Sequence, residues 1–163
     1  MSKESKSKQS AQHEHFMALT LSIAEENKRQ GGYGVGAMVV KSGEIIASSD
    51  NSIRRTCDPT GHAEVNAIRE ASQRLNSERL TDCWLYSSYE PCAMCAAAAA
   101  WARMKGIVFA NRIYDSRNPQ SYRVDVTCEA IVNASSPKLE IIPDVLRERG
   151  MALMDFRPGE RKK

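Results

Sequence analysis

A histidine and two cysteines stand in this chain at a spacing that suits a metal site. His62 opens a His-Ala-Glu triplet, and Cys92 and Cys95 belong to a Pro-Cys-x-x-Cys run further along. One imidazole and two thiolates suit Zn²⁺, and they leave the fourth position of its tetrahedron open for water. An open position is typical of a catalytic site, whereas structural zinc sites are closed by a fourth protein ligand. The sequence therefore predicts one catalytic Zn²⁺ per chain, held by these three residues.

Glu64 lies two residues after the histidine, where its carboxylate can reach a metal-bound water without becoming a ligand. That placement predicts a general acid and base. Each motif alone has an ordinary reading, because C-x-x-C is also the spacing of redox pairs and His-x-Glu occurs at many helix starts. Their joint occurrence favours catalytic zinc. Glu64 also counts against a non-catalytic zinc protein, which has no use for an uncoordinated carboxylate.

The elements that carry these residues alternate between strands and helices. Hydrophobic periodicity predicts strands over 35–40, 44–48, 83–88, 106–110 and 139–142, and helices over 12–30, 62–75, from 91 onward, over 124–132 and over 143–156. The short link 41–43 predicts a hairpin between the first two strands, and Gly150 is expected to break the last helix. This alternation predicts one three-layer α/β domain with a mixed sheet.

Both halves of the predicted site fall at helix starts. His62 and Glu64 lie in the first turn of the helix that follows the turn 58–61, and Cys92 and Cys95 project from one side of the next helix. The partial positive charge at a helix start favours thiolates over thiols. We therefore expect the helix to help deprotonate the ligands that it presents.

Composition predicts one folded unit between two polar tails. We expect residues 1–11 to be a disordered polar tail, residues 12–156 the single domain, and residues 157–163 a basic C-terminal tail. The net charge of +3 is concentrated at the ends, since the part between residues 16 and 156 carries 16 basic and 17 acidic side chains. A near-neutral domain does not favour a nucleic-acid partner, so we expect a small-molecule substrate.

The sequence predicts a cytoplasmic location. No apolar stretch is long enough to cross a membrane, and the first residues lack the apolar segment of a secretory signal. Five cysteines, an odd number, agree with a reducing compartment. Outside the predicted site, we expect Cys57, Cys83 and Cys128 to be buried free thiols.

Two stretches, 58–69 and 82–95, resemble the zinc deaminases of the cytidine-deaminase-like fold, and among them the bacterial guanine deaminase group. H-x-E followed by P-C-x-x-C is the signature of zinc deaminases. Trp101-Ala102-Arg103 is also similar to that group, and a weaker likeness extends over residues 14–156. The resemblance implies a three-layer α/β/α cytidine-deaminase-like fold with a mixed central sheet. It also implies that His62, Cys92 and Cys95 bind zinc and that Glu64 shuttles protons.

The implied reaction is hydrolytic deamination of a free nucleobase, with guanine converted to xanthine and ammonia as the first expectation. Zinc brings the pKa of its bound water to about 7. Glu64 would take the water's proton, pass it to the ring nitrogen, and then protonate the leaving amine in a second transfer. Cytosine, a nucleoside or another aminated heterocycle is the alternative substrate. The tRNA adenosine deaminases share both motifs, but the loop 111–117 lacks the Gly and Lys expected of them.

Four further residues gain a substrate-binding role from the resemblance, and each keeps an ordinary alternative. Asn51 binds the base edge or is a turn residue, and Ala63 offers its backbone N–H to the base or is only small. Asp115 accepts from a purine ring N–H or is a solvated loop residue. Phe156 closes over the base from a partner subunit, as in a homodimer with exchanged C-terminal segments, or packs locally.

The chain departs from the resemblance in two places. The family commonly has Gly-Gly-Pro-Phe-Gly before the first strand, whereas residues 31–36 here read Gly-Gly-Tyr-Gly-Val-Gly. The last residues, 157–163, contain no terminal aromatic residue that would serve as a lid. The first segment is expected to line the substrate side, so the identity of the base stays open at this point.

Overall fold

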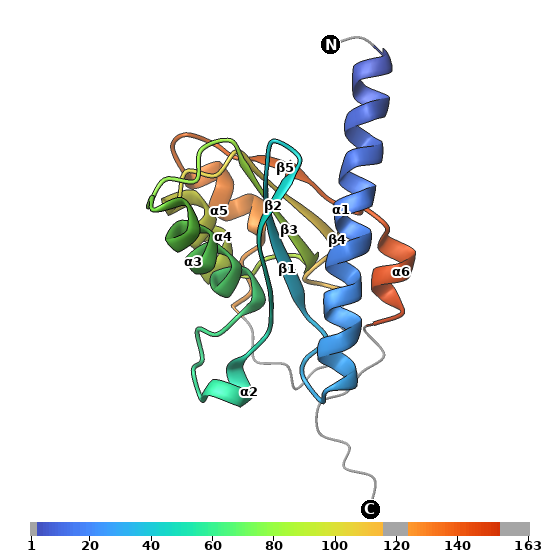
Figure 1. Ribbon diagram of the computed structural model, residues 1–163, viewed down its shortest axis with the longest axis vertical. Coiled ribbons are helices and arrows are strands. Elements are labelled where there is room, and N and C mark those ends of the chain that lie inside the picture. Colours follow the sequence, from blue (N-terminus) through green and yellow to red (C-terminus); the bar gives the residue numbers. More distant parts are fainter. Residues whose placement is uncertain (1–2, 116–123, 154–163) are drawn as a thin grey trace, which may run out of the picture.

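The computed structural model describes residues 3–115 and 124–153, which form a five-stranded sheet between helices (Figure 1). The strand order is β2-β1-β3-β4-β5. The strands are β1 (Gly36–Lys41), β2 (Glu44–Asp50), β3 (Cys83–Tyr89), β4 (Gly106–Asn111) and β5 (Glu140–Ile142). β1 runs antiparallel to β2 and β3, while β3, β4 and β5 are parallel. The prediction of a mixed sheet is confirmed.

Helices cover both faces of the sheet and complete three layers (Figure 1). They are α1 (Lys3–Arg29), α2 (Ile53–Thr56), α3 (Ala63–Leu75), α4 (Ala93–Trp101), α5 (Cys128–Ala134) and α6 (Arg147–Met151). α3, α4 and α5 lie on one face, and α1 and α6 lie on the other. Among the described helices, none is long and apolar enough to cross a membrane.

Alternation along β3 shows how the sequence builds these layers. Cys83 and Leu85 are fully buried in the core under α3 and α4, whereas Trp84 and Tyr86 belong to a second core under α1. Successive side chains of a strand point to opposite faces, so an unbroken apolar run indicates a strand covered on both sides. β3 is therefore the centre of the molecule, with a core on each face.

The direction of the strands determines which edge of the sheet carries the site, since β2, β3 and β4 all end at the same edge. The carboxyl ends of these strands lie at one edge, and α3 and α4 begin there (Figure 1). The hairpin predicted between β1 and β2 is present, with Ser42 and Gly43 at φ 51° and 84° in its two-residue turn. Positive φ at both positions is the geometry of the hairpin turn that matches the twist of the strands. This turn lies at the opposite edge of the sheet.

The N-terminal segment differs from its prediction. The structure begins α1 at Lys3, so residues 3–11, which we expected to be a disordered tail, are helical and extend past the sheet (Figure 1). The first buried residue of α1 is His13, and Phe16, Met17 and Leu21 follow on the same buried face. Lys, Gln and Glu are good helix formers, and they add turns cheaply to a helix that packing has already nucleated.

The C-terminal third is less helical than predicted. α5 begins at Cys128 rather than near residue 124, because Thr127 caps it by accepting a hydrogen bond from the Ala130 backbone N–H at 3.2 Å. α6 is a short helix after Leu146, whose φ of 54° interrupts any helix from Pro143. The guanidinium of Arg149 donates to Glu25 and so ties α6 to α1. Phe156 lies outside the described residues.

Candidate metal centre

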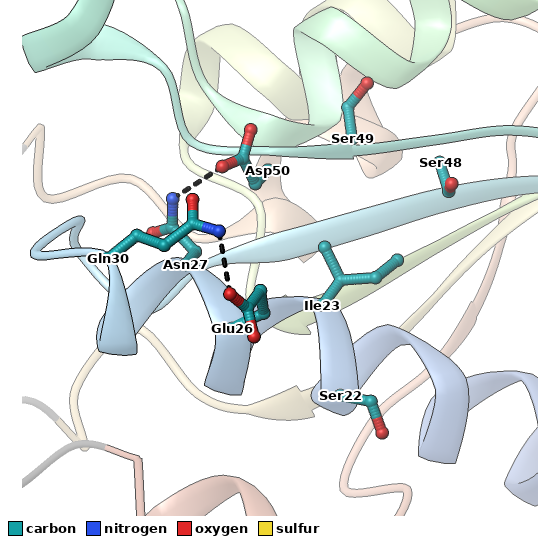
Figure 2. Close-up of a pocket in the computed structure, with 8 residues that line it drawn as sticks. All are labelled: Ser22, Ile23, Glu26, Asn27, Gln30, Ser48, Ser49 and Asp50. Atoms are coloured by element: carbon teal, nitrogen blue, oxygen red, sulfur yellow. Dashed lines mark hydrogen bonds between the residues drawn. The ribbon is translucent and has the colours of Figure 1, made fainter.

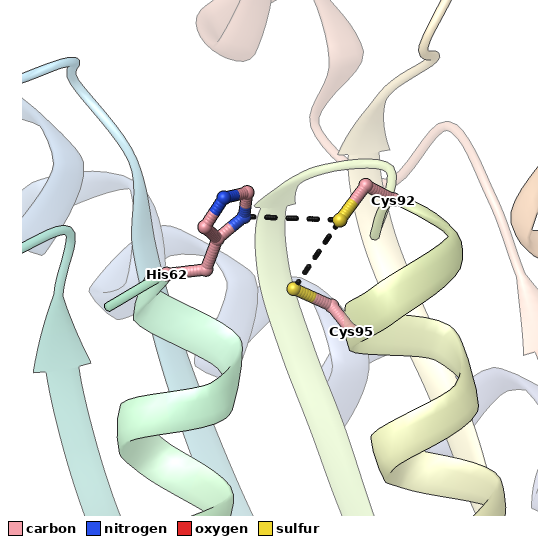
Figure 3. Close-up of side chains that lie close together, drawn as sticks. All are labelled: His62, Cys92 and Cys95. Atoms are coloured by element: carbon pink, nitrogen blue, oxygen red, sulfur yellow. Dashed lines mark hydrogen bonds between the residues drawn. The ribbon is translucent and has the colours of Figure 1, made fainter. Parts of the chain in front are cut away.

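His62, Cys92 and Cys95 converge on one point at the edge of the sheet (Figure 3). Their ligand atoms lie within 4.8 Å of one another, with 3.8 Å between His62 Nδ1 and Cys92 Sγ and 3.6 Å between the two sulfurs. A tetrahedral Zn²⁺, with bonds of about 2.3 Å to sulfur and about 2.0 Å to nitrogen, separates its ligand atoms by roughly 3.5–3.8 Å. The three residues therefore fit a zinc ion in donor type, and two of the three ligand pairs already have the spacing of a tetrahedral site.

Local turns place these ligands at the starts of two helices. His62 is the N-cap residue of α3 and Cys92 is that of α4, both with extended backbone. The turn before His62 is closed by the Gly61 N–H, which donates to the Asp58 carbonyl at 3.0 Å, and the Asp58 carboxylate accepts from the Thr60 N–H at 2.8 Å. The N-terminal N–H groups of both helices face the cluster and favour negative charge on the sulfurs.

The two sulfurs are coupled through their hydrogen bond. The hydrogen bond with Cys95, followed by the one with His62, lowers the pKa of the Cys92 thiol to about 4. The same contact raises the pKa of Cys95, and burial raises it further. The contact with Cys92 also raises the pKa of His62. Since a metal binds thiolates and neutral imidazole, loading of this site releases protons.

Glu64 lies directly beside the ligands and is 3% exposed. Its Oε2 is 3.6 Å from Cys95 Sγ, and its Oε1 accepts a hydrogen bond from the Ser87 hydroxyl at 2.9 Å. Burial raises the pKa of this carboxyl above its ordinary value. A carboxyl group that takes up a proton more readily than an exposed one is suited to proton transfer near neutral pH.

A hydrogen-bond network fixes Asn51 near the start of α3. Asn51 is buried, its Oδ1 accepts from the Ile53 N–H at 3.2 Å, and its backbone carbonyl accepts from Asn27 at 3.0 Å. Asn66 of α3 donates to the Asp50 carbonyl at 3.1 Å and to Ser52 Oγ at 3.0 Å. The loop that carries Asn51 is thus bonded to the helix that carries His62.

Three other residues were predicted to bind the substrate, and only one of them, Ala63, adjoins the metal cluster in the described structure. Ala63 is fully buried at the first position of α3, between His62 and Glu64. Asp115 pairs with Arg147, and its Oδ2 also accepts from the Arg112 N–H at 2.7 Å. Arg147 lowers the pKa of Asp115, so this carboxylate is ionised and joins the loop after β4 to α6. A base-binding role for Asp115 stays a prediction, and Phe156 falls outside the described residues.

Glu90 joins two loops beside the site. Its Oε2 accepts from the Ile113 N–H and its Oε1 from the Cys128 N–H, each at 2.9 Å. These contacts give Glu90 a structural role. Cys83 and Cys128 are buried as predicted, whereas Cys57 is exposed, because it follows the short helix α2, which the sequence did not predict.

A separate hollow lies between α1 and the edge strand β2 (Figure 2). The residues that line it are Ser22, Ile23, Glu26, Asn27, Gln30, Ser48, Ser49 and Asp50. Its polar groups bond to their neighbours, since Asn27 donates to Asp50 at 2.8 Å and Gln30 donates to Glu26 at 2.7 Å. None of the three ligands or Glu64 lines this hollow, so it is distinct from the candidate metal centre.

Known proteins share this arrangement. The family model described as "Cytidine and deoxycytidylate deaminase zinc-binding region" matches residues 10–111. Guanine deaminase of Bacillus subtilis strain 168 is 46% identical over 99 residues, which are 60% of this chain and 64% of that protein. A tRNA-specific adenosine deaminase of Aquifex aeolicus strain VF5 is 43% identical over 96 residues, which are 59% of this chain and 64% of that protein. The matches therefore span less than two thirds of these relatives.

Solved structures share the fold over most of the chain. Guanine deaminase from Nitrosomonas europaea has a TM-score of 0.77 and 26% identity, covering 87% of this chain and 82% of its own. A variant protein in complex with the nucleobase analogue 8-azaguanine has a TM-score of 0.78 and 25% identity, covering 88% of this chain and 82% of its own. The predicted cytidine-deaminase-like fold is confirmed.

Removal of the two thiolate ligands tests the metal centre. We expect the Cys92→Ser, Cys95→Ser double variant to lose its zinc, because two of three protein ligands are gone, and metal analysis of the purified protein measures this. The exposed Cys57→Ser variant is the matched control and retains about one zinc per chain. Full zinc occupancy in the double variant would show that the ligands lie elsewhere.

Proposed function

The chain belongs to the cytidine and deoxycytidylate deaminase zinc-binding family, and from this we propose that it is a zinc-dependent hydrolytic deaminase of a free nucleobase. Guanine, giving xanthine and ammonia, is the first candidate substrate. One zinc per chain, held by His62, Cys92 and Cys95, is part of this proposal. The cytoplasmic location expected from the sequence stays a prediction.

The observation that carries the proposal is the position of the Glu64 carboxylate. It is buried, it lies 3.6 Å from the sulfur of a candidate ligand, and it adds no ligand atom to the three-residue cluster. A zinc ion bound there supplies a water molecule acidic enough to act as the nucleophile at neutral pH. A free carboxylate beside that position accepts a proton early in the reaction and returns it later, so one residue serves as base and then as acid.

The remaining residues of the site would bind the base next to this carboxylate. The amide of Asn51 offers a donor and an acceptor on one group, which matches the edge of a nucleobase. The N–H of Ala63 lies in the first turn of α3, where backbone N–H groups have no partner within the helix. Both residues adjoin a ligand or the loop bonded to it, and this supports the proposed substrate-binding role.

We prefer guanine for two reasons, which are the residue types in the loop after β4 and the charge of the folded part. Residues 111–117 lack the Gly and Lys expected of tRNA adenosine deaminases, and the part of the chain between the polar tails is nearly neutral. The 46% and 43% identities to a guanine deaminase and a tRNA-specific adenosine deaminase are too similar to separate the two substrates. Substrate specificity therefore needs a direct measurement.

A tRNA substrate is the second candidate, and one surface feature favours it. The guanidinium of Arg54 lies 4.6 Å from the centre of the Tyr33 ring. Tyr33 lies in the loop before β1, and Arg54 lies in the short helix α2, which follows β2. Aromatic rings with an adjacent cation are a common contact for unpaired bases and phosphates. In a tRNA substrate, this pair is a candidate contact for nucleotides next to the deaminated base.

A homodimer is part of the proposal, with α4 as its contact surface. Cys95, Ala96 and Ala99 face the core, whereas Met94 and Trp101 on the opposite side are 36% and 85% exposed. The helix Ala-Met-Cys-Ala-Ala-Ala-Ala-Ala-Trp has no charged residue, although the solvent face of a helix is normally polar. A second copy would cover this face. We further expect the two copies to exchange their C-terminal segments, so that Phe156 of one copy closes over the base bound to the other.

Replacement of the shuttle carboxylate tests the chemistry. We expect Glu64→Gln to retain the fold and the zinc, because the amide is nearly isosteric, and to lose about two or more decades in kcat, because an amide does not exchange protons as a carboxylate does. Ammonia release and metal content measured on the same preparation check both halves. Near wild-type turnover in this variant contradicts the proposed mechanism.

Ammonia release from the wild-type protein identifies the substrate. The panel is guanine, guanosine, cytosine, cytidine, adenine and a tRNA anticodon stem-loop, and we expect the highest kcat/KM with guanine. A site that bonds to the edge of the base separates close analogues by several decades, so the ranking is decisive. A higher kcat/KM for cytosine or for the stem-loop would replace guanine as the substrate and leave the deaminase proposal intact.

A charge on the apolar face of α4 tests the dimer. We expect the wild-type chain to have the mass of a dimer in light scattering and Trp101→Glu to shift it toward the monomer, since a carboxylate is costly to bury in a contact. Ile45→Glu is the control, because Ile45 is also an exposed apolar residue, at 42%, but lies on β2. A monomeric wild type, or dissociation by the Ile45 variant alone, contradicts the proposed surface.

A further inference from the structure

Ser87 lies in the central strand beneath the candidate site. It belongs to β3, which pairs with β1 on one side and with β4 on the other, and its side chain is fully buried. Cys83 and Leu85 of the same strand point into the core under α3 and α4. Alternation along the strand directs the Ser87 side chain to that same face of the sheet. Glu64 lies on this face too, in the first turn of α3.

The hydroxyl of Ser87 has a defined direction. It donates to Glu64 Oε1 at 2.9 Å, while Ser87 Oγ accepts from the Tyr89 N–H at 3.4 Å. The Tyr89 N–H occupies an acceptor position of Oγ, so the single hydrogen of the hydroxyl belongs to the contact with Glu64. A polar side chain at a position where its strand neighbours are apolar is costly to bury unless it has such a partner.

This contact makes the two oxygens of Glu64 unequal. Oε1 is held by Ser87, whereas Oε2 lies 3.6 Å from Cys95 Sγ, which is one of the three candidate ligands. A glutamate side chain has three rotatable bonds, and an anchor on one oxygen limits where the other oxygen lies. Since β3 is covered on both faces and paired along both edges, the anchor itself is rigid.

We propose that Ser87 is a positioning residue for the deamination, because its hydroxyl holds Oε1 of Glu64 and leaves Oε2 as the oxygen that exchanges protons with the reacting groups. This inference rests on the proposed function of Glu64. Ser87 does not touch the substrate, and it acts only through the carboxylate. A displacement of about 1 Å of a reacting group costs up to about a hundredfold in rate, so loss of this anchor reduces turnover without removing the shuttle.

The variant Ser87→Ala removes the hydroxyl and leaves the strand intact. With the base that the wild-type protein turns over fastest, we expect kcat to fall about tenfold or more, while KM stays within about twofold and zinc content is unchanged. Ser87→Thr keeps the hydroxyl on a β-branched residue that strands tolerate, and we expect it to recover most of kcat. Recovery by Thr separates loss of the anchor from loss of packing.

The neighbouring serine is a matched control. Ser88 lies on the same strand, is 2% exposed, and its Oγ accepts from the Gly36 N–H at 3.1 Å on the other face of the sheet. Ser88→Ala thus removes one buried hydroxyl and one hydrogen bond without contact to Glu64. We expect it to lower the midpoint of urea unfolding as Ser87→Ala does, and to leave kcat close to the wild-type value.

A double-mutant cycle tests the contact without any turnover. We measure the urea midpoints of the wild type, Ser87→Ala, Glu64→Ala and the double variant, all zinc-loaded. Because Ser87 acts through Glu64, we expect Ser87→Ala to shift the midpoint by at most about half as much when Glu64 is absent. Additive shifts would mean that the hydroxyl and the carboxylate do not interact in solution.

The outcomes separate this inference from the proposed function. The positioning role is supported if Ser87→Ala loses kcat, Ser87→Thr recovers it, and Ser88→Ala does not share the loss. Coupling between Ser87 and Glu64 in the double-mutant cycle must accompany these results. A wild-type kcat in Ser87→Ala, an equal loss in Ser88→Ala, or additive unfolding overturns it. If the wild-type protein deaminates nothing in the panel, the proposed function fails. The positioning role in catalysis then falls with it, while the cycle still decides whether Ser87 holds Glu64.

Discussion

The site depends on one constraint, which is that two helices must begin side by side at the same edge of the sheet. His62 comes from the start of α3, and Cys92 and Cys95 come from the start of α4, yet their ligand atoms lie within 4.8 Å of one another. β2 and β3 both run antiparallel to β1, so both end at this edge, where β2 leads by way of α2 into α3 and β3 leads into α4. The helix starts then add favourable electrostatics for thiolates and for a proton-exchanging carboxylate.

The cluster of His62, Cys92 and Cys95 and the place of Glu64 beside it could be predicted because their geometry is local. Two cysteines three residues apart on a helix share one side, and a residue two positions after a helix cap lies in its first turn, so short motifs already define most of the cluster. The distance between the two motifs depends on strand pairing, which no local pattern specifies. Family resemblance implied only a mixed central sheet, and the observed sheet agrees with that.

The parts that sequence reasoning missed depend on contacts between distant residues. The hydrogen bond from Ser87 to Glu64 joins positions 23 residues apart, and the pair Asp115 and Arg147 joins positions 32 residues apart. A serine within an apolar strand was the available signal for the first, since buried hydroxyls need partners. The second had none, because an aspartate in a polar loop looks the same whether it meets an arginine or solvent. The start of α1 was missed because composition alone did not show that a packed helix would continue into a polar segment.

The strand order has a consequence for the way this molecule opens. β3 is the middle strand, and β5, which has three residues, lies at the edge of the sheet and leads into the short helix α6. Local unfolding starts where few hydrogen bonds and little apolar burial oppose it, so we expect the described segment from β5 to α6 to exchange its amide hydrogens before β3 does. Opening of this segment leaves in place the strands and helix starts that carry His62, Cys92 and Cys95.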